Sequence, residues 1–204
     1  MKYILFISFF TLLSSCTITR TKKIEINFTR ETPASLQSFL DGRVEYDKAD
    51  IATLNSINAL VAYNDSERLS VPEAYFFNRH GYRVKNNFRG TNCGQVIKNT
   101  HQINTAPSDN KEHIDDWIKD YTFPLGEDTL SNTGGDYDAY IIITWAKFVE
   151  QLSSSSNENA INWYRSVKEL NSMRIKVIFL NLDIQESWTL TDEQEKALGL
   201  NRQG

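Results

Sequence analysis

The stretches that decide the fold are YDAYIIITW at residues 137–145 and IKVIFLNL at residues 175–182. Each holds an unbroken apolar run, which is typical of a strand buried on both faces. Apolar residues recur every three positions over 160–170, which predicts a helix between the two strands, preceded by a solvent-exposed loop at Ser153–Asn157. The order strand, helix, strand predicts a right-handed βαβ unit with parallel strands.

Upstream of this unit, two aromatic segments flank a short turn. Residues 74–77 and 82–85 surround Asn78-Arg79-His80-Gly81, a pattern that predicts a β-hairpin. Helices are predicted at Ser35–Leu40, from Lys48 to Tyr63, at Lys111–Tyr121 and from a capped start at Thr191 to Gly199. Together these elements predict an α/β fold with a central sheet, a C-terminal βαβ unit and a β-hairpin, flanked by helices.

The composition excludes several classes of protein. The chain has 204 residues with 22 basic and 26 acidic side chains, a formal net charge of -4. This length favours one domain, and the acidic balance without a basic stripe argues against a nucleic-acid partner. The sequence holds no zinc-ligand spacing, phosphate-binding glycine loop or hydrolase nucleophile motif, so we expect neither a metal nor another cofactor.

The N-terminus carries the most specific motif. Residues 1–16 read MKYILFISFFTLLSSC, a basic residue followed by an apolar run, small residues and a cysteine. Leu13-Ser14-Ser15-Cys16 resembles the lipobox of bacterial lipoproteins, which implies a signal peptide at 1–15 and a lipid on Cys16 that anchors the protein in a membrane. Thr17 after the cysteine then implies the outer membrane, facing the periplasm. The alternative is a plain signal peptide with a chance cysteine.

The domain boundaries follow from this interpretation. Residues 16–34, rich in Thr, Lys and Arg, are expected to be a tether with weak strand character, and residues 35–204 a single α/β domain. With Cys16 lipidated, Cys93 is the remaining thiol of the mature chain, so an internal disulfide is excluded.

The βαβ segment resembles thioredoxin-like proteins of the thiol-disulfide TlpA type. In that family a strand ending in Trp-Ala, here Trp145-Ala146, leads into the redox loop, and the next strand ends in a motif similar to Asn181-Leu182-Asp183. Where the family carries Cys-x-x-Cys, this chain has Lys147-Phe148-Val149-Glu150. The resemblance therefore implies the fold without the dithiol.

The hairpin resembles the second half of the same fold. Val71-Pro72 and the strands after it are similar to the family's cis-proline segment and closing hairpin, which normally follow the βαβ unit. Their earlier place here indicates either a circularly permuted thioredoxin-like domain or a coincidental hairpin. The permuted fold predicts that residues 140–144 lie beside both 175–182 and, antiparallel, 74–78.

Three functions remain open from the sequence. The first is a non-catalytic binding or assembly module for an envelope protein, with Pro72, Trp145 and Phe148 as an apolar binding face; Trp145 as a plain core residue is the alternative. The second is a monothiol redox protein acting through Cys93, which is otherwise a small buried residue. The third is an immunity or inhibitor lipoprotein.

Overall fold

The computed structural model describes residues 27–66, 68, 70–84, 100–126 and 137–200. Its centre is a seven-stranded mixed sheet with the strand order β4-β3-β2-β6-β7-β1-β5. The strands are β1 (Ile51–Leu54), β2 (Ala74–Asn78), β3 (Tyr82–Val84), β4 (Ser108–His113), β5 (Tyr121–Thr122), β6 (Ala139–Trp145) and β7 (Ile175–Asn181). The mixed α/β class predicted from the sequence is therefore confirmed.

The predicted βαβ unit forms the middle of the sheet. Strands β6 and β7 pair in parallel along their whole length, with Ile142 opposite Ile178. Every residue of β6 is buried, as its unbroken apolar sequence requires. Helix α6 (Ser154–Lys168) connects the two strands and begins inside the predicted loop. That loop prediction was wrong: the first turn of α6 is polar, but the buried Asn157 fixes it through hydrogen bonds to the backbone of Ala146, just after β6.

The predicted hairpin is also present. Strand β2 pairs antiparallel with β3 on one side and with β6 on the other, where Phe76 lies opposite Ile141. Residues 140–144 thus lie between β7 and β2, as predicted. The peptide bond between Val71 and Pro72 is cis.

The helix predicted from Lys48 to Tyr63 is wrong. Residues Lys48–Asp50 form a short 3-10 helix (η1), β1 follows, and helix α3 spans Ile57–Asp65. All four residues of β1 are buried. The apolar residues of this strand stand by coincidence at positions that continue the helical spacing of the next segment, and this spacing led to the wrong prediction. The Ser56 side chain accepts a hydrogen bond from the backbone of Ala59 and thereby starts α3 two residues after the strand.

The helix predicted at Lys111–Tyr121 is shorter than expected. Strand β4 occupies residues up to His113 and pairs with β3, and helix α5 spans only Ile114–Ile118. The change occurs at His113, whose ring accepts a hydrogen bond from the backbone N–H of Asp115 and caps α5. The structure of this segment is determined by its pairing with β3, which cannot be inferred from the local periodicity of the sequence.

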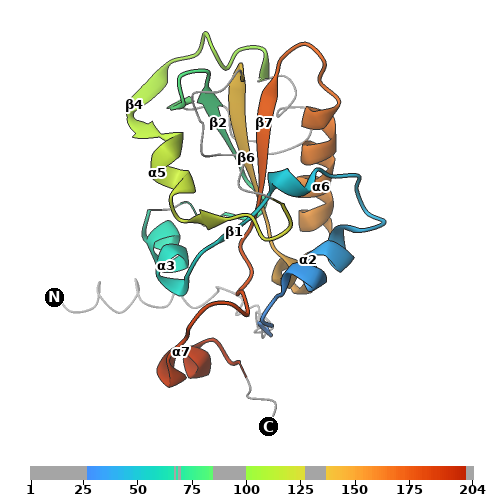
Figure 1. The fold of residues 1–204 in the computed structure, drawn as a ribbon, viewed down its shortest axis with the longest axis vertical. Helices are drawn as coiled ribbons and strands as arrows, with labels where there is room; N and C mark the ends of the chain where they lie inside the picture. Colours follow the sequence, from blue (N-terminus) through green and yellow to red (C-terminus); the bar gives the residue numbers. More distant parts are fainter. Residues whose placement is uncertain (1–26, 67, 69, 85–99, 127–136, 201–204) are drawn as a thin grey trace, which may run out of the picture.

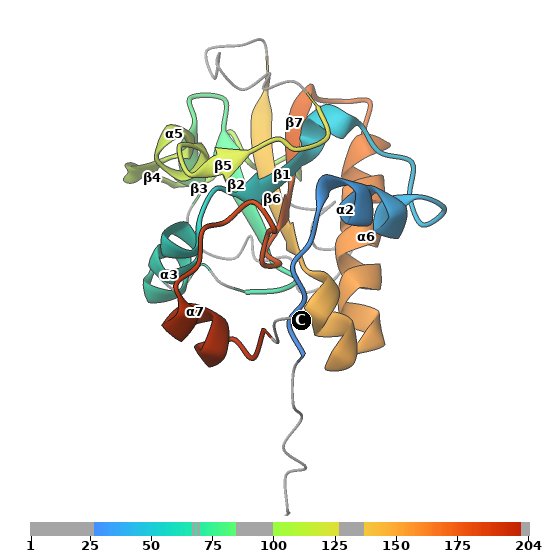
Figure 2. The ribbon, with the colours of Figure 1, turned by 60° about the horizontal axis from the view of Figure 1, so that its bottom comes forward.

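Helices cover both faces of the sheet. Alternate β6 side chains point to opposite faces, so Ile141 and Ile143 pack with α6 and with α2 (Pro33–Leu40), while Tyr140 and Ile142 pack with α3 and α5. Figures 1 and 2 show α2 and α6 on one side, α3 and α5 on the other, and α7 (Asp192–Ala197) beyond the end of the sheet. Helices α2 and α7 each begin with a capping box, as predicted for α7.

The last residues of the expected tether pack on the domain. Glu31 is buried and forms an isolated parallel bridge with Gln185, and Thr32 caps α2. The domain therefore begins ahead of Ser35, while residues 1–26 lie outside the described structure. Among the described helices, none combines the length and apolar character needed to cross a membrane.

Candidate functional site

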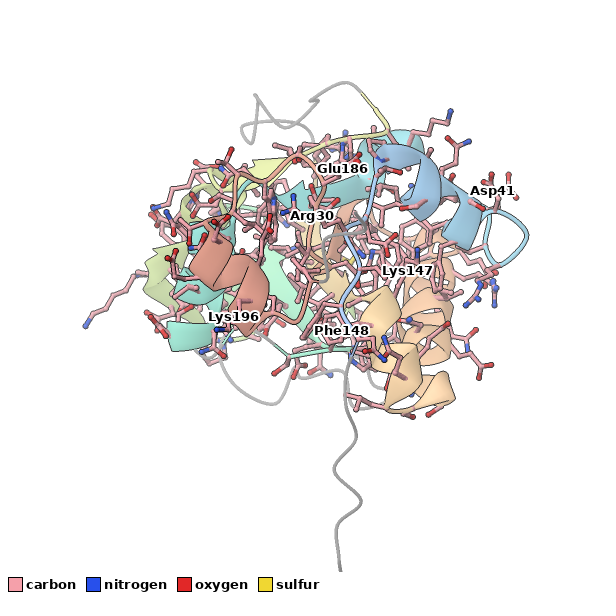
Figure 3. The ribbon with its side chains drawn as sticks, turned by 90° about the horizontal axis from the view of Figure 1, so that it is seen from below. Arg30, Asp41, Lys147, Phe148, Glu186 and Lys196 are labelled. Carbon is pink, nitrogen blue, oxygen red and sulfur yellow. The ribbon has the colours of Figure 1, made fainter. Side chains whose placement is uncertain are left out.

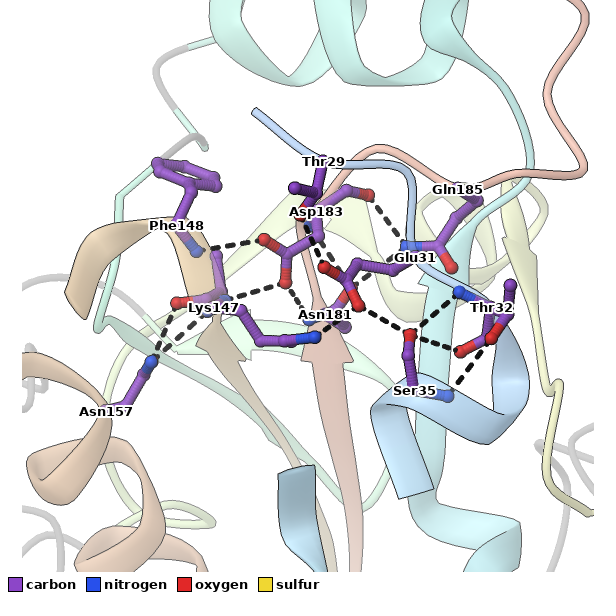
Figure 4. A network of polar contacts seen from close by, with 11 residues as sticks. Thr29, Glu31, Thr32, Ser35, Lys147, Phe148, Asn157, Asn181, Asp183 and Gln185 are labelled. Carbon is purple, nitrogen blue, oxygen red and sulfur yellow. Dashed lines mark hydrogen bonds and ion pairs between the residues drawn. The ribbon is translucent and has the colours of Figure 1, made fainter. Parts of the chain in front are cut away.

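The candidate site lies where the parallel strands β6 and β7 end. In open α/β sheets, ligands bind beyond the carboxyl ends of the strands. Here the chain leaves β6 directly into a 3-10 helix, η2 (Lys147–Gln151), and leaves β7 into residues 182–185. Figure 4 shows that polar side chains fill this region, together with the segment that precedes α2.

Asp183 holds the start of η2. Its carboxylate accepts hydrogen bonds from the backbone N–H groups of Lys147 (2.7 Å) and Phe148 (3.1 Å) and from the Asn181 amide (2.6 Å). Burial raises the pKa of Asp183 above its usual value, although these hydrogen bonds act in the opposite direction. Asp183 thus supplies the N-terminal cap that Ala146, at the cap position, lacks.

A second carboxylate, Glu31, forms the ion pair of the site. It is 3% exposed, and its Oε2 atom accepts hydrogen bonds from the Lys147 ammonium and the Ser35 hydroxyl, both at 2.5 Å. Thr29 donates to Oε1 at 2.7 Å. Burial pushes the pKa of Glu31 upward, but the hydrogen bonds from these three side chains outweigh it, so the pKa lies below its usual value.

Glu31 belongs to an extended segment that we call the strap, residues 27–32. Its backbone pairs with the segment that follows β7: the N–H of Glu31 donates to Ile184 O (2.7 Å), and the N–H of Glu186 donates to Glu31 O (2.8 Å). Figure 3 shows the strap running across the end of the molecule between α7 and η2. The strap therefore lies across the carboxyl end of the parallel strands.

Both ends of the strap have additional contacts. The Gln151 amide accepts from the N–H of Asn27 (2.9 Å) and donates to its carbonyl (2.8 Å). The rings of Phe28 and Phe148 meet edge to face at 5.2 Å. On the other side, Arg30 forms an ion pair with Glu195 of α7.

The sequence-predicted binding face is not assembled as expected. Trp145 is completely buried, with Phe39 and Phe179 stacked on its ring at 5.4 and 5.2 Å, so it is a core residue and the prediction was wrong for it. Phe148 is partly exposed and belongs to the strap contacts. Pro72 is also partly exposed, in a segment tied to β6 through Thr144, which donates to Ser70 O.

Cys16 and Cys93 both lie outside the described residues. In the described ranges, His, Cys, Asp and Glu side chains form no group of three or more suited to hold a metal ion.

Sequence reasoning missed the network of the site. Asn181 is the polar last residue of an otherwise apolar strand, and Asp183 follows two positions later. This pattern indicates a strand end that faces polar groups. Asn157 appeared as part of a serine-rich loop, yet its side chain makes two hydrogen bonds with the backbone of Ala146. Glu31 had no sequence signal at all, because it lies in the polar segment interpreted as a tether.

The charged side chains of the site are bonded to one another and to the neighbouring backbone. Lys147, Glu31 and Asp183 are each bonded to another group of the network, so the ammonium and the carboxylates hold backbone and side chains in place. The backbone pairing of Glu31 has the same chemistry as the main-chain hydrogen bonds by which extended peptides add to a sheet edge. Comparisons with protein-family models, curated proteins and solved structures give no significant match.

Proposed function

We propose that the protein is a lipid-anchored binding or assembly module of the bacterial cell envelope, built on a degenerate thioredoxin-like fold. The strand order β3-β2-β6-β7, with β2 antiparallel and β7 parallel to β6, supports the fold assignment. In the permuted form of that fold the hairpin comes before the βαβ unit, and β4, β1 and β5 extend the sheet at its two sides.

The observation that carries the proposal is the structure of the segment at the position where the resembled family has its redox loop. The segment after Trp145-Ala146 is η2, whose first N–H groups are capped by Asp183 and whose Lys147 pairs with Glu31. Dithiol exchange needs a thiolate attacker and a resolving partner. A charged side chain and a phenylalanine at this position favour binding over redox catalysis.

The anchor position fits this role. Asn27, at the start of the strap, is eleven residues from Cys16, a span of at most about 40 Å of extended chain. A lipid on Cys16 would therefore keep the strap and the carboxyl end of the sheet near the membrane surface, where an anchored protein meets envelope partners.

The anchor is tested by Cys16→Ala in cells of a Gram-negative host. We expect the variant to leave the membrane fraction or to accumulate as an unprocessed precursor. A variant that still fractionates with membranes at the mature size would contradict lipidation.

The binding role is tested by co-purification from detergent-solubilised membranes. We expect a stoichiometric partner that is retained with Cys93→Ser and lost with Phe148→Asp, because the partly exposed ring at η2 would become charged. Leu152→Asp is the matched control, since Leu152 is 47% exposed just beyond η2. Loss of function with Cys93→Ser would instead favour the monothiol redox protein.

A further inference from the structure

We infer that the carboxyl end of the sheet binds one extended polypeptide segment with an aromatic residue three positions before a carboxylate, and that the strap fills this site until a partner segment replaces it. The inference rests on the proposed binding function and names its partner class and its regulation.

The backbone contacts define an extended ligand. Glu31 donates one main-chain hydrogen bond and accepts another in the parallel bridge with Gln185, in the segment that follows β7. Four residues earlier, the Gln151 amide makes a matching pair of bonds with the Asn27 backbone. Such contacts are independent of side chain, so any extended segment of this length can make them.

Two side chains give the site its selectivity. Phe28 meets the ring of Phe148 at 5.2 Å, and three positions later Glu31 reaches Lys147 and Ser35. Phe148 and Lys147 belong to η2 and Ser35 belongs to α2, so these side chains stay in place when residues 27–31 leave and Thr32 keeps its position as the cap of α2. The domain side thus presents an aromatic ring, an ammonium and a hydroxyl to whichever segment occupies the site.

The strap is suited to exchange because several of its contacts lie near the solvent. The Lys147 side chain is 27% exposed, and the Arg30–Glu195 pair and the Asn27–Gln151 pair lie near the solvent. A tethered segment competes at an effective concentration in the millimolar range, so a free peptide binds the closed protein weakly. A partner held at the same membrane gains a comparable local concentration and can replace the strap.

The test uses the full-length protein in detergent and a fluorescent peptide with the strap sequence, NFTRET. In the double variant Phe28→Ala/Glu31→Ala we expect the peptide to bind at least tenfold more tightly than to the unaltered chain, measured by fluorescence anisotropy. Arg30→Ala is the matched control, because it alters the strap but keeps both selective side chains; it should bind the peptide as weakly as the unaltered chain.

Two further measurements make the result decisive. A peptide with both selective residues replaced, NATRAT, should not bind the double variant, and adding Lys147→Met should abolish binding of NFTRET. Failure of the folded double variant to bind NFTRET, or equal binding of NATRAT, overturns the inference. If circular dichroism shows the double variant unfolded, Phe28→Ala/Glu31→Gln, which removes the ring and the charge from the strap but keeps a hydrogen-bonding group at position 31, replaces it, and the peptide should again bind more tightly than to the unaltered chain.

These outcomes are separate from those of the proposed function. The peptide experiment needs neither a membrane nor a cellular partner, so a negative result rules out the exchange of the strap and leaves the proposed anchored binding role open. A negative co-purification result rules out the proposed binding role, even if the peptide binds.

Discussion

The sheet carries a buried charged network at each end of its parallel strands, and the two networks differ in origin. At the amino end, Asp50 accepts hydrogen bonds from Lys168 (2.9 Å), Lys176 (3.0 Å) and the Tyr164 hydroxyl (2.9 Å). All four groups belong to η1, α6 and β7, so the network joins elements of the core to one another. At the carboxyl end, one of the charges comes from the strap.

The two networks also differ in sign. The amino end combines one carboxylate with two ammonium groups, of which Lys176 is 7% exposed and Lys168 is 40% exposed. The carboxyl end combines Glu31 and Asp183 with Lys147, which is 27% exposed. Each network thus has one ammonium group in contact with solvent, and what distinguishes the carboxyl end is that one of its carboxylates belongs to the strap.

The largest effect is expected from Asp50→Asn. It leaves two ammonium groups without their carboxylate, one of them buried, and breaking such an arrangement costs about 3–5 kcal/mol of unfolding free energy. Urea denaturation measures the loss, with Glu45→Gln on the exposed loop as a control expected to change stability by less than about 0.5 kcal/mol. A loss below about 1 kcal/mol for Asp50→Asn would mean that the amino-end network is not structural.

Glu31→Gln is expected to cost less, about 1–3 kcal/mol. Lys147 loses its partner but can turn toward solvent, and the strap backbone keeps its bonds to Ile184 and Glu186. The same denaturation series measures it. A loss equal to that of Asp50→Asn would erase the difference between the two networks and favour a purely structural strap.

The carboxyl-end network predicts opposite pH responses for its two acids. The pKa of Glu31 is lowered from 4.5, so its contribution is present above that pH and is lost as pH falls through the folded-state pKa. The pKa of Asp183 is raised from 3.8, so its ionisation opposes folding, and this penalty disappears on acidification. Unfolding free energies should show Glu31→Gln approaching the unaltered protein below about pH 4.5.

Asp183→Asn supplies the contrast. Relative to this variant, the unaltered protein should gain stability as pH falls, because only the unaltered protein recovers the burial penalty of the carboxylate. Parallel responses of the two variants would contradict the assignment of different roles to the two acids.

The smallest effect is expected from Arg30→Ala. The side chains of Arg30 and Glu195 are 31% and 20% exposed, and ion pairs of this kind contribute less than about 1 kcal/mol. Thermal unfolding should show a small shift that salt reduces further. A larger loss of stability would mean that the contact with α7 is one of the main interactions that hold the strap in place.

The sequence predicted the centre of the fold because its strands are marked by composition alone. The apolar runs of β6 and β7 and the aromatic hairpin led to correct neighbours and correct directions. Segments with mixed polarity failed, as with β4, where pairing to β3 and the cap at His113 replaced the expected helix. Propensity is local, and these choices depend on distant strands.

The site was predicted only at its centre. Phe148 follows a strand end and was identified, whereas Trp145, for which a binding face and a plain core role were both open, is buried between two stacked rings. Glu31 was invisible because its burial depends on Lys147 and Ser35, 116 and 4 positions away in the chain. A polar residue becomes a site residue through its partners, and these are defined only by the folded chain.

The antiparallel pairing of β2 with β6 has a practical consequence for labelling. Asn78 lies opposite Ala139, so the hairpin turn ending at Gly81 is at the opposite end of the sheet from the strap. Seven residues of β6 separate the two ends by roughly 20 Å. A fluorophore at the exposed Arg79 would therefore report on the molecule from the end of the sheet that lies away from the strap, without touching the strap.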